Sequence, residues 1–190
     1  YCCPPNLARL LAQTAEYAYA VSTDRVYTGL YGQGRAQIQL ENGASAVIHQ
    51  RTDYPMGGEI SLTADDWNGI PFTLCLRIPG WAEGAQIHCP DQTISPDAGS
   101  YAEVKVDRAD FACTLNLPMN PRLTIGHDMI EEDENHACVE VGPLVYCMES
   151  QDAHEPLACY LLPAGCIYAE GEGPLAVLRQ TFRDVYRELV

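Results

Sequence analysis

The stretch RAQIQLENGASAVIHQ, residues 35–50, contains two runs of alternating polar and apolar residues joined by an Asn-Gly dipeptide. Before the dipeptide, Ile38 and Leu40 alternate with polar neighbours, which is the two-residue period of a half-buried β-strand. Asn42 and Gly43 readily adopt the positive φ angles that hairpin turns require. The stretch therefore predicts an antiparallel β-hairpin.

Similar short runs, separated by Gly, Asn, Asp and Pro, lie on both sides of this hairpin at intervals of about 8 to 14 residues. Such spacing is typical of an antiparallel β-sandwich. We expect a mainly β fold, with a jelly-roll-like antiparallel sandwich over residues 23–130. Residues 131–190 are expected to add further strands, in the same domain or in a second β-sandwich domain.

The N-terminal segment has a helical period instead. Its apolar positions share one helix face, at Leu7, Leu10, Leu11, Ala15, Ala18 and Val21. Asn6, or the prolines before it, provides the start signal, and we expect the helix to run to about Ala20. The apolar face needs a partner, and no comparable helix follows closely. The partner is therefore expected to lie in missing sequence, in a chain cut from a longer protein.

The C-terminal tail, LAVLRQTFRDVYRELV, allows two structures. Its apolar residues have helical spacing, yet PLAVLR after a Gly-rich segment also suits a strand. Before the tail, an acidic run suggests a solvated loop, with a metal site as the less favoured alternative; that site would use Glu131, Glu132, Asp133, Glu134 and His136.

The net charge excludes some classes of partner. The 190 residues include 26 acids and 11 bases, a formal net charge of −15. Phosphates would be repelled, so neither a nucleic acid nor an anionic membrane is expected as a partner. No apolar run approaches the roughly 20 residues that a membrane-spanning helix needs, and no targeting signal is evident.

The nine cysteines are odd in number and unevenly spaced, and several lie within apolar strand-like runs. A free cysteine in such a run behaves as a small buried hydrophobic residue. This pattern favours a reducing cytoplasm over an oxidising compartment.

Cys2 and Cys3 are adjacent at the expected helix start, just before two prolines. Adjacent cysteines rarely bond to each other, because the small ring strains the peptide between them. Two alternatives follow from the residues alone: two ligands of one soft cation, with Zn²⁺ the best match, or two inert, reduced cysteines packed in a barrel or core interface. Two ligands do not complete a tetrahedral site, so zinc requires further groups from elsewhere.

Other candidate sites have weaker support. The histidines are scattered without a metal-binding spacing, and surface or core roles are favoured for all five, His49, His88, His127, His136 and His154. No nucleophile elbow, phosphate-binding loop or dinucleotide fingerprint is present. Trp67 and Trp81 could line a sugar-binding face, although aromatic residues of strands more often belong to the core.

Six motifs occur in the order and approximate spacing of the C-terminal half of glycoside hydrolase family 127, the β-L-arabinofuranosidase family. They are CCPPNLARLLA, VYTGLYG, TDYPMGGEISLT, FTLCLRIPGWAEGA, LNLPMNPRL and VEVGPLVYCMES, and the resemblance covers roughly residues 1–165. It implies an N-terminal (α/α)6 barrel that holds the active site, followed by β-sandwich domains. Residues 1–22 would then be the last helix of that barrel.

The resemblance also implies roles for the cysteine pair. Cys2 matches the catalytic nucleophile, and Cys3 matches a neighbouring zinc ligand. In the family's mechanism a zinc-bound thiolate attacks the anomeric carbon, a glutamic acid protonates the leaving oxygen and then activates water, and the configuration is retained. The other ligands and that glutamate lie upstream in the family, and neither Glu16 nor Glu41 replaces them.

Two classes of function follow. The first is the C-terminal portion of a retaining glycosidase, with zinc in the full-length parent, inactive as this fragment. Its expected partners are the parent's barrel and an arabinose-containing oligosaccharide. The alternative is a non-catalytic carbohydrate-binding or structural support module.

Overall fold

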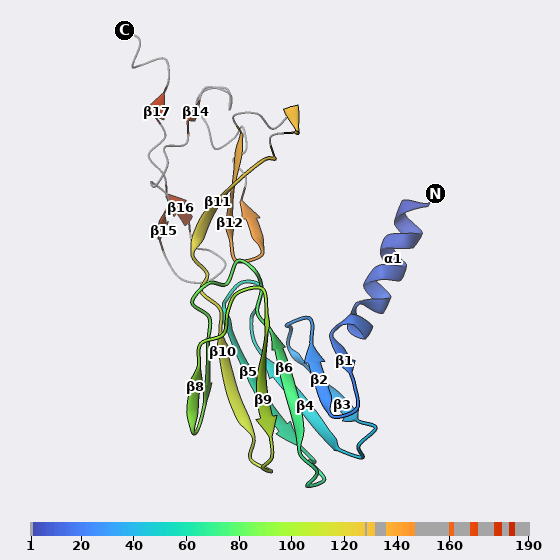
Figure 1. Cartoon of the computed structure of the whole chain (residues 1–190). Coiled ribbons are helices and arrows are strands. Elements are labelled where there is room, and N and C mark those ends of the chain that lie inside the picture. The colour runs from blue at the N-terminus through green and yellow to red at the C-terminus, as the bar shows by residue number, and fades with distance from the viewer. Residues whose placement is uncertain are drawn as a thin grey trace. The chain divides into compact units, whose positions relative to one another are not determined.

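The computed structural model describes residues 2–127, 129–131 and 136–146 with their side chains, and beyond them only the backbone of four short strands. The chain divides into two compact units, Tyr1–Pro118 and Met119–Val190 (Figure 1). The sequence pattern predicted the boundary between the sandwich and the further strands near residue 130.

The first unit begins with helix α1 (Cys3–Gln13) and a 3-10 turn, η1 (Thr14–Tyr17). Ten strands follow: β1 (Tyr19–Val21), β2 (Arg25–Thr28), β3 (Gly34–Gln39), β4 (Ser45–Arg51), β5 (Glu59–Asp65), β6 (Phe72–Arg77), β7 (Gln86–Cys89), β8 (Gln92–Ile94), β9 (Tyr101–Val106) and β10 (Ala112–Asn116). They form a four-stranded sheet in the order β1-β2-β6-β9 and a six-stranded sheet in the order β3-β4-β5-β10-β7-β8.

Alternating burial along the strands produces one core between the two sheets. In β4 and β9 every second side chain is buried, as the two-residue period requires. Leu74 and Leu76 from the smaller sheet and Ile48, Leu62 and Leu115 from the larger one are fully buried in the same cluster. The predicted mainly β sandwich with a single N-terminal helix is therefore confirmed.

The hairpin predicted from residues 35–50 joins β3 to β4, with Gln39 opposite Ser45. Its turn is longer than a two-residue turn, because the Leu40 N–H still donates to the Ala44 carbonyl at 2.9 Å. Gly43 has a φ of +85°, which glycine adopts without strain. The Asn-Gly dipeptide thus provides the left-handed residue of a three-residue loop.

One pair of strands departs from the antiparallel prediction. β2 and β6 run parallel, with Val26 opposite Leu74, whereas the other strand pairs within residues 2–118 are antiparallel. The three strands between β2 and β6 in the chain belong to the other sheet. Periodicity reports which face of a strand is buried and not the direction of its neighbour.

The prediction of a helix to about Ala20 is wrong. The α-helix ends at Gln13, and Tyr19–Val21 forms β1, which pairs with β2. The helical spacing of apolar residues continues past the end of the helix by coincidence, because Ala18 lies in a turn and Val21 in a strand. None of the α1 side chains is buried.

The second unit contains an antiparallel sheet of β11 (Pro121–Ile125), β12 (Ala137–Val141) and β13 (Leu144–Tyr146). Across β11 and β12, Arg122 Nη2 lies 2.9 Å from Glu140 Oε2, and Arg122 Nη1 donates to the Gly142 carbonyl at 2.7 Å.

Four short strands follow, and they pair antiparallel as β14 with β17 and β15 with β16: β14 (Tyr160–Leu161), β15 (Tyr168–Glu170), β16 (Val177–Arg179) and β17 (Arg183–Asp184). The strand alternative for PLAVLR is thus confirmed over Val177–Arg179. Within the residues that the structure describes, no helix is long and apolar enough to cross a membrane.

Candidate functional site

The cysteine pair lies at the start of α1. Cys2 immediately precedes the helix and already has helical angles, φ −79° and ψ −35°. Pro4 and Pro5 have fixed φ angles and lack an N–H group, so they suit a first helical turn, where amides have no partner within the helix. The two Sγ atoms are 3.5 Å apart, and both side chains are exposed. Two thiols are therefore held side by side on a stiff backbone.

This spacing fits two sulfur ligands of one tetrahedral zinc ion. With Zn–S distances of about 2.3 Å, two such sulfurs lie about 3.8 Å apart. A zinc site needs at least three protein ligands, and the described residues contain no group of three or more His, Cys, Asp and Glu side chains that could hold a metal. Among the described residues the pair therefore supplies too few ligands for a complete zinc site. Both side chains are exposed in this chain, and the two alternatives, a pair of zinc ligands and a pair of inert cysteines packed at a barrel or core interface, stay predictions.

The acidic run falls mostly outside the described residues. Glu131 and His136 are exposed, while Glu132, Asp133 and Glu134 are not described. Both alternatives for this segment, a solvated loop and a metal site, stay predictions.

Three of the histidines have local polar contacts. These contacts, at 3.0–3.2 Å, join His49 to Asp65, His88 to Thr93 and His127 to the Met129 amide. His154 lies outside the described residues. The contacts support the predicted surface roles of these three.

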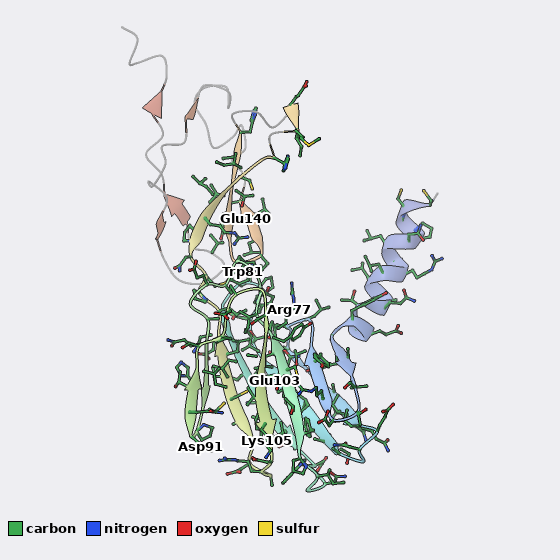
Figure 2. The ribbon with its side chains drawn as sticks, in the orientation of Figure 1. Arg77, Trp81, Asp91, Glu103, Lys105 and Glu140 are labelled. Carbon is green, nitrogen blue, oxygen red and sulfur yellow. The ribbon has the colours of Figure 1, made fainter. Side chains whose placement is uncertain are left out.

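Trp67 and Trp81 are half-buried and pack against the sandwich core, and Trp81 lies at one end of the sandwich (Figure 2). Trp67 Nε1 donates to the Ile70 carbonyl at 2.8 Å. A ring that stacks on a sugar must present its face to solvent. The packing therefore supports the core role for both rings over a sugar-binding face.

Sequence reasoning missed a hollow of about 530 Å³ lined by η1, β1, the segment after β2 and Gln50. Gln50 is 3% exposed, and its Nε2 donates to Tyr19 Oη at 2.5 Å, but its Oε1 has no hydrogen-bond partner among the residues that the structure describes. The signal was present in the sequence. Gln50 follows Ala46 and Ile48 at two-residue intervals, on the strand face where apolar side chains are expected.

Tyr31 also lines this hollow, and its Oη donates to the Arg77 carbonyl at 2.7 Å. Burial raises the pKa of the Tyr31 phenol above its usual value of 10.0, and burial also raises the pKa values of Tyr19 and Tyr54. Above about pH 10 the unfolded chain loses these protons while the folded chain keeps them. The free energy of unfolding then falls by up to about 1.4 kcal/mol per pH unit for each group.

We expect Tyr31→Phe to be less stable than the wild type at neutral pH, by about 1 kcal/mol, because the hydrogen bond to Arg77 is lost. Its stability should fall less steeply at alkaline pH, since one group with a raised pKa has been removed. Urea unfolding near neutral pH and above about pH 10 measures both effects. An identical alkaline slope in both proteins would contradict the role given to Tyr31.

Two adjoining segments of the chain match the models of one enzyme family. Residues 25–119 match "Beta-L-arabinofuranosidase, GH127 middle domain", and residues 121–179 match "Glycoside hydrolase family 127 C-terminal domain". The chain belongs to glycoside hydrolase family 127. The junction of the two matches, between residues 119 and 121, lies next to the division between Pro118 and Met119. The family predicted from the motifs is thereby confirmed.

Known family members share both sequence and fold with this chain. The non-reducing end beta-L-arabinofuranosidase of Bifidobacterium longum subsp. longum is 29% identical over 177 residues, which cover 89% of this chain and 26% of that enzyme. The solved GH127 beta-L-arabinofuranosidase of Geobacillus stearothermophilus T6 has a TM-score of 0.80 and 32% identity, covering 93% of this chain and 29% of that one. Another solved GH127 beta-arabinofuranosidase has a TM-score of 0.78 and 28% identity, covering 95% and 32%.

The chain therefore spans between a quarter and a third of the length of these relatives. The relatives are glycoside hydrolases of the predicted kind, and their activity is a property of chains much longer than this one.

Proposed function

We propose that this chain is the β-sandwich portion of a longer retaining glycoside hydrolase that releases arabinose from arabinose-containing oligosaccharides. The observation that carries the proposal is an exposed pair of thiols, 3.5 Å apart at the start of α1, in a chain of family 127. In this proposal the helical segment before β1, α1 with η1, is the last part of an (α/α)6 catalytic barrel, which is the partner of the sandwich within the same parent.

The exposed face of α1 supports a partner for this helix. Leu7, Leu10 and Leu11 are 59%, 55% and 68% exposed and lie at helical spacing on one face. Single exposed leucines are common, but three on one helix face form an apolar strip that a neighbouring helix would cover.

In the proposed reaction Cys2 is the nucleophile and Cys3 is a metal ligand. Bound Zn²⁺ would keep the thiols ionised near neutral pH. Cys2 Sγ attacks the anomeric carbon and displaces the leaving alcohol with inversion, and water then displaces Sγ with a second inversion. The product therefore retains the configuration of the substrate.

The proton donor and the remaining ligands are assigned to the preceding part of the protein. Glu41 is not proposed as a substitute; its Oε2 accepts a hydrogen bond from Thr23 Oγ1 at 3.1 Å in the first unit. Glu16 lies in η1 with its side chain exposed. The proposal also places the parent in a reducing cytoplasm, which suits the free thiols of the cysteines described.

The isolated 190-residue chain is expected to show no turnover of an arabinofuranoside, whereas the full-length parent turns it over and contains zinc. The measurement is release of arabinose by both proteins at equal concentration. Turnover by the isolated chain would overturn the assignment of the acid/base group to the preceding part. Heat of binding with arabino-oligosaccharides in calorimetry of the isolated chain would instead favour the carbohydrate-binding module.

A further inference from the structure

Two cysteines far apart in the sequence meet on neighbouring strands of the six-stranded sheet. β7 and β10 pair antiparallel, with His88 opposite Thr114. Continuing this register by one residue places Cys89 opposite Cys113. Both are free thiols.

The two cysteines also share a face of the sheet. Ile87 and Leu115 are fully buried, and residues two positions away on a strand lie on the same face. Cys113 is 4% exposed within the core, and Cys89 is half-buried and packs against that core. Each thiol is close enough to influence the pKa of the other.

Their spacing suits a disulfide. Directly opposed residues of an antiparallel pair have Cα atoms about 4.5 or 5.5 Å apart, and disulfides span Cα separations of about 4.4–6.8 Å. Both Cα separations therefore lie within the range that a disulfide spans. β7 has only the three-residue strand β8 beyond it, so a small closing movement meets little resistance from the rest of the sheet.

Cys89 can be reached from solvent while Cys113 cannot. Cys89 lines a hollow of about 340 Å³ together with Asp91, Lys105 and Arg108. Figure 2 shows Asp91 and Lys105 at the same end of the sandwich, and Arg108 forms an ion pair with Asp91. A small reagent in this hollow would meet Cys89 first.

We propose that Cys89 and Cys113 are a redox-sensitive pair that closes to a disulfide between β7 and β10 on reaction with a low-molecular-weight disulfide. Cys89 loses its proton to solvent, and its Sγ attacks one sulfur of the reagent, so the reagent's S–S bond breaks and one thiolate leaves. Cys113 then loses its proton, attacks the Cys89 sulfur and releases the second thiolate. Two protein thiols are oxidised and one disulfide is reduced to two thiols.

The environment makes this pair slow to react. Burial raises the pKa of the Cys89 thiol and raises that of Cys113 to about 12. For Cys89, Asp91 adds to the increase and Arg108 opposes it. Because only the thiolate attacks a disulfide, the pair reacts slowly at neutral pH and faster at alkaline pH.

Tryptic mapping tests the proposal directly. The chain is incubated with oxidised glutathione at mildly alkaline pH, its free thiols are alkylated, and it is digested without reduction. Cys89 and Cys113 lie alone in tryptic peptides 78–105 and 109–122, and we expect these two peptides to be recovered joined. A disulfide that encloses a loop of about 25 residues should also raise Tm by about 5 °C or more.

Three variants sharpen the result. Cys89→Ser should abolish the joined peptides and leave Cys113 free, whereas Cys113→Ser should accumulate glutathione on Cys89, because no second thiol displaces it. Cys75→Ser, a control at another buried cysteine, should leave the joined peptides unchanged. The proposal fails if both peptides are recovered alkylated after Cys2 and Cys3 have reacted, or if they join only in urea.

Discussion

Leu62→Ala is expected to lower the free energy of unfolding of the first unit by about 3 kcal/mol. Leu62 is fully buried on β5, opposite Gln50 of β4 and Cys113 of β10. Paired strands flank it on both sides, so the cavity left by the shorter side chain cannot collapse freely. Since single domains have free energies of unfolding of about 5–15 kcal/mol, this loss is a large fraction of the total.

The measurement is urea unfolding followed by tryptophan fluorescence. Both tryptophans of the chain, Trp67 and Trp81, lie in the first unit and pack against its core, so the signal follows that unit alone. The urea midpoint should fall while the slope m stays unchanged.

Leu10→Ala provides a matched control, because the chemical change is the same on a side chain of α1 that is 55% exposed. It should change the free energy of unfolding by no more than about 0.5 kcal/mol. Equal losses for the two variants would show that the burial assigned to Leu62 is wrong.

The sandwich could be predicted because the alternation of polar and apolar residues along a strand shows which of its faces is buried. In the segment from Ala44 to Gln50 every second side chain is buried, and the Asn-Gly dipeptide marks the turn before it. The end of α1 could not be predicted, since Ala18 and Val21 continue the helical spacing after the backbone has left the helix. Pairing of Tyr19–Val21 with β2 overrides that local pattern.

The cysteine pair could be found from sequence because its two members are neighbours in the chain, and the structure adds their 3.5 Å separation and their exposure. Gln50 could have been found from the sequence, because it is a polar residue on the strand face where apolar side chains are expected. The position of Cys89 opposite Cys113 could not be found from the sequence, because it depends on β7 lying beside β10. Sequence spacing can indicate a hairpin of two successive strands, but it does not show which strands distant in the chain become neighbours.

In the full-length parent, Cys2→Ser is expected to reduce arabinofuranoside turnover by at least about 10³-fold, which is the order of loss when a nucleophile is removed. A serine hydroxyl is far less acidic than a thiol and a poorer zinc ligand. Loss of metal alone would also lower turnover, so turnover by itself cannot assign the nucleophile.

Cys3→Ser makes the same atomic change one residue away, at a sulfur 3.5 Å from that of Cys2. If Cys3 is only a ligand, this variant should lose zinc and turnover but still form a covalent bond at Cys2 with an arabinofuranose analogue that carries an electrophile at its anomeric carbon. Cys2→Ser should not be labelled, even when zinc is supplied in excess. Mass spectrometry of the tryptic peptide that contains Cys2 and Cys3 separates the two sites by fragmentation. A label on Cys3, or an equal label in both variants, would show that the direction of attack has been assigned to the wrong sulfur.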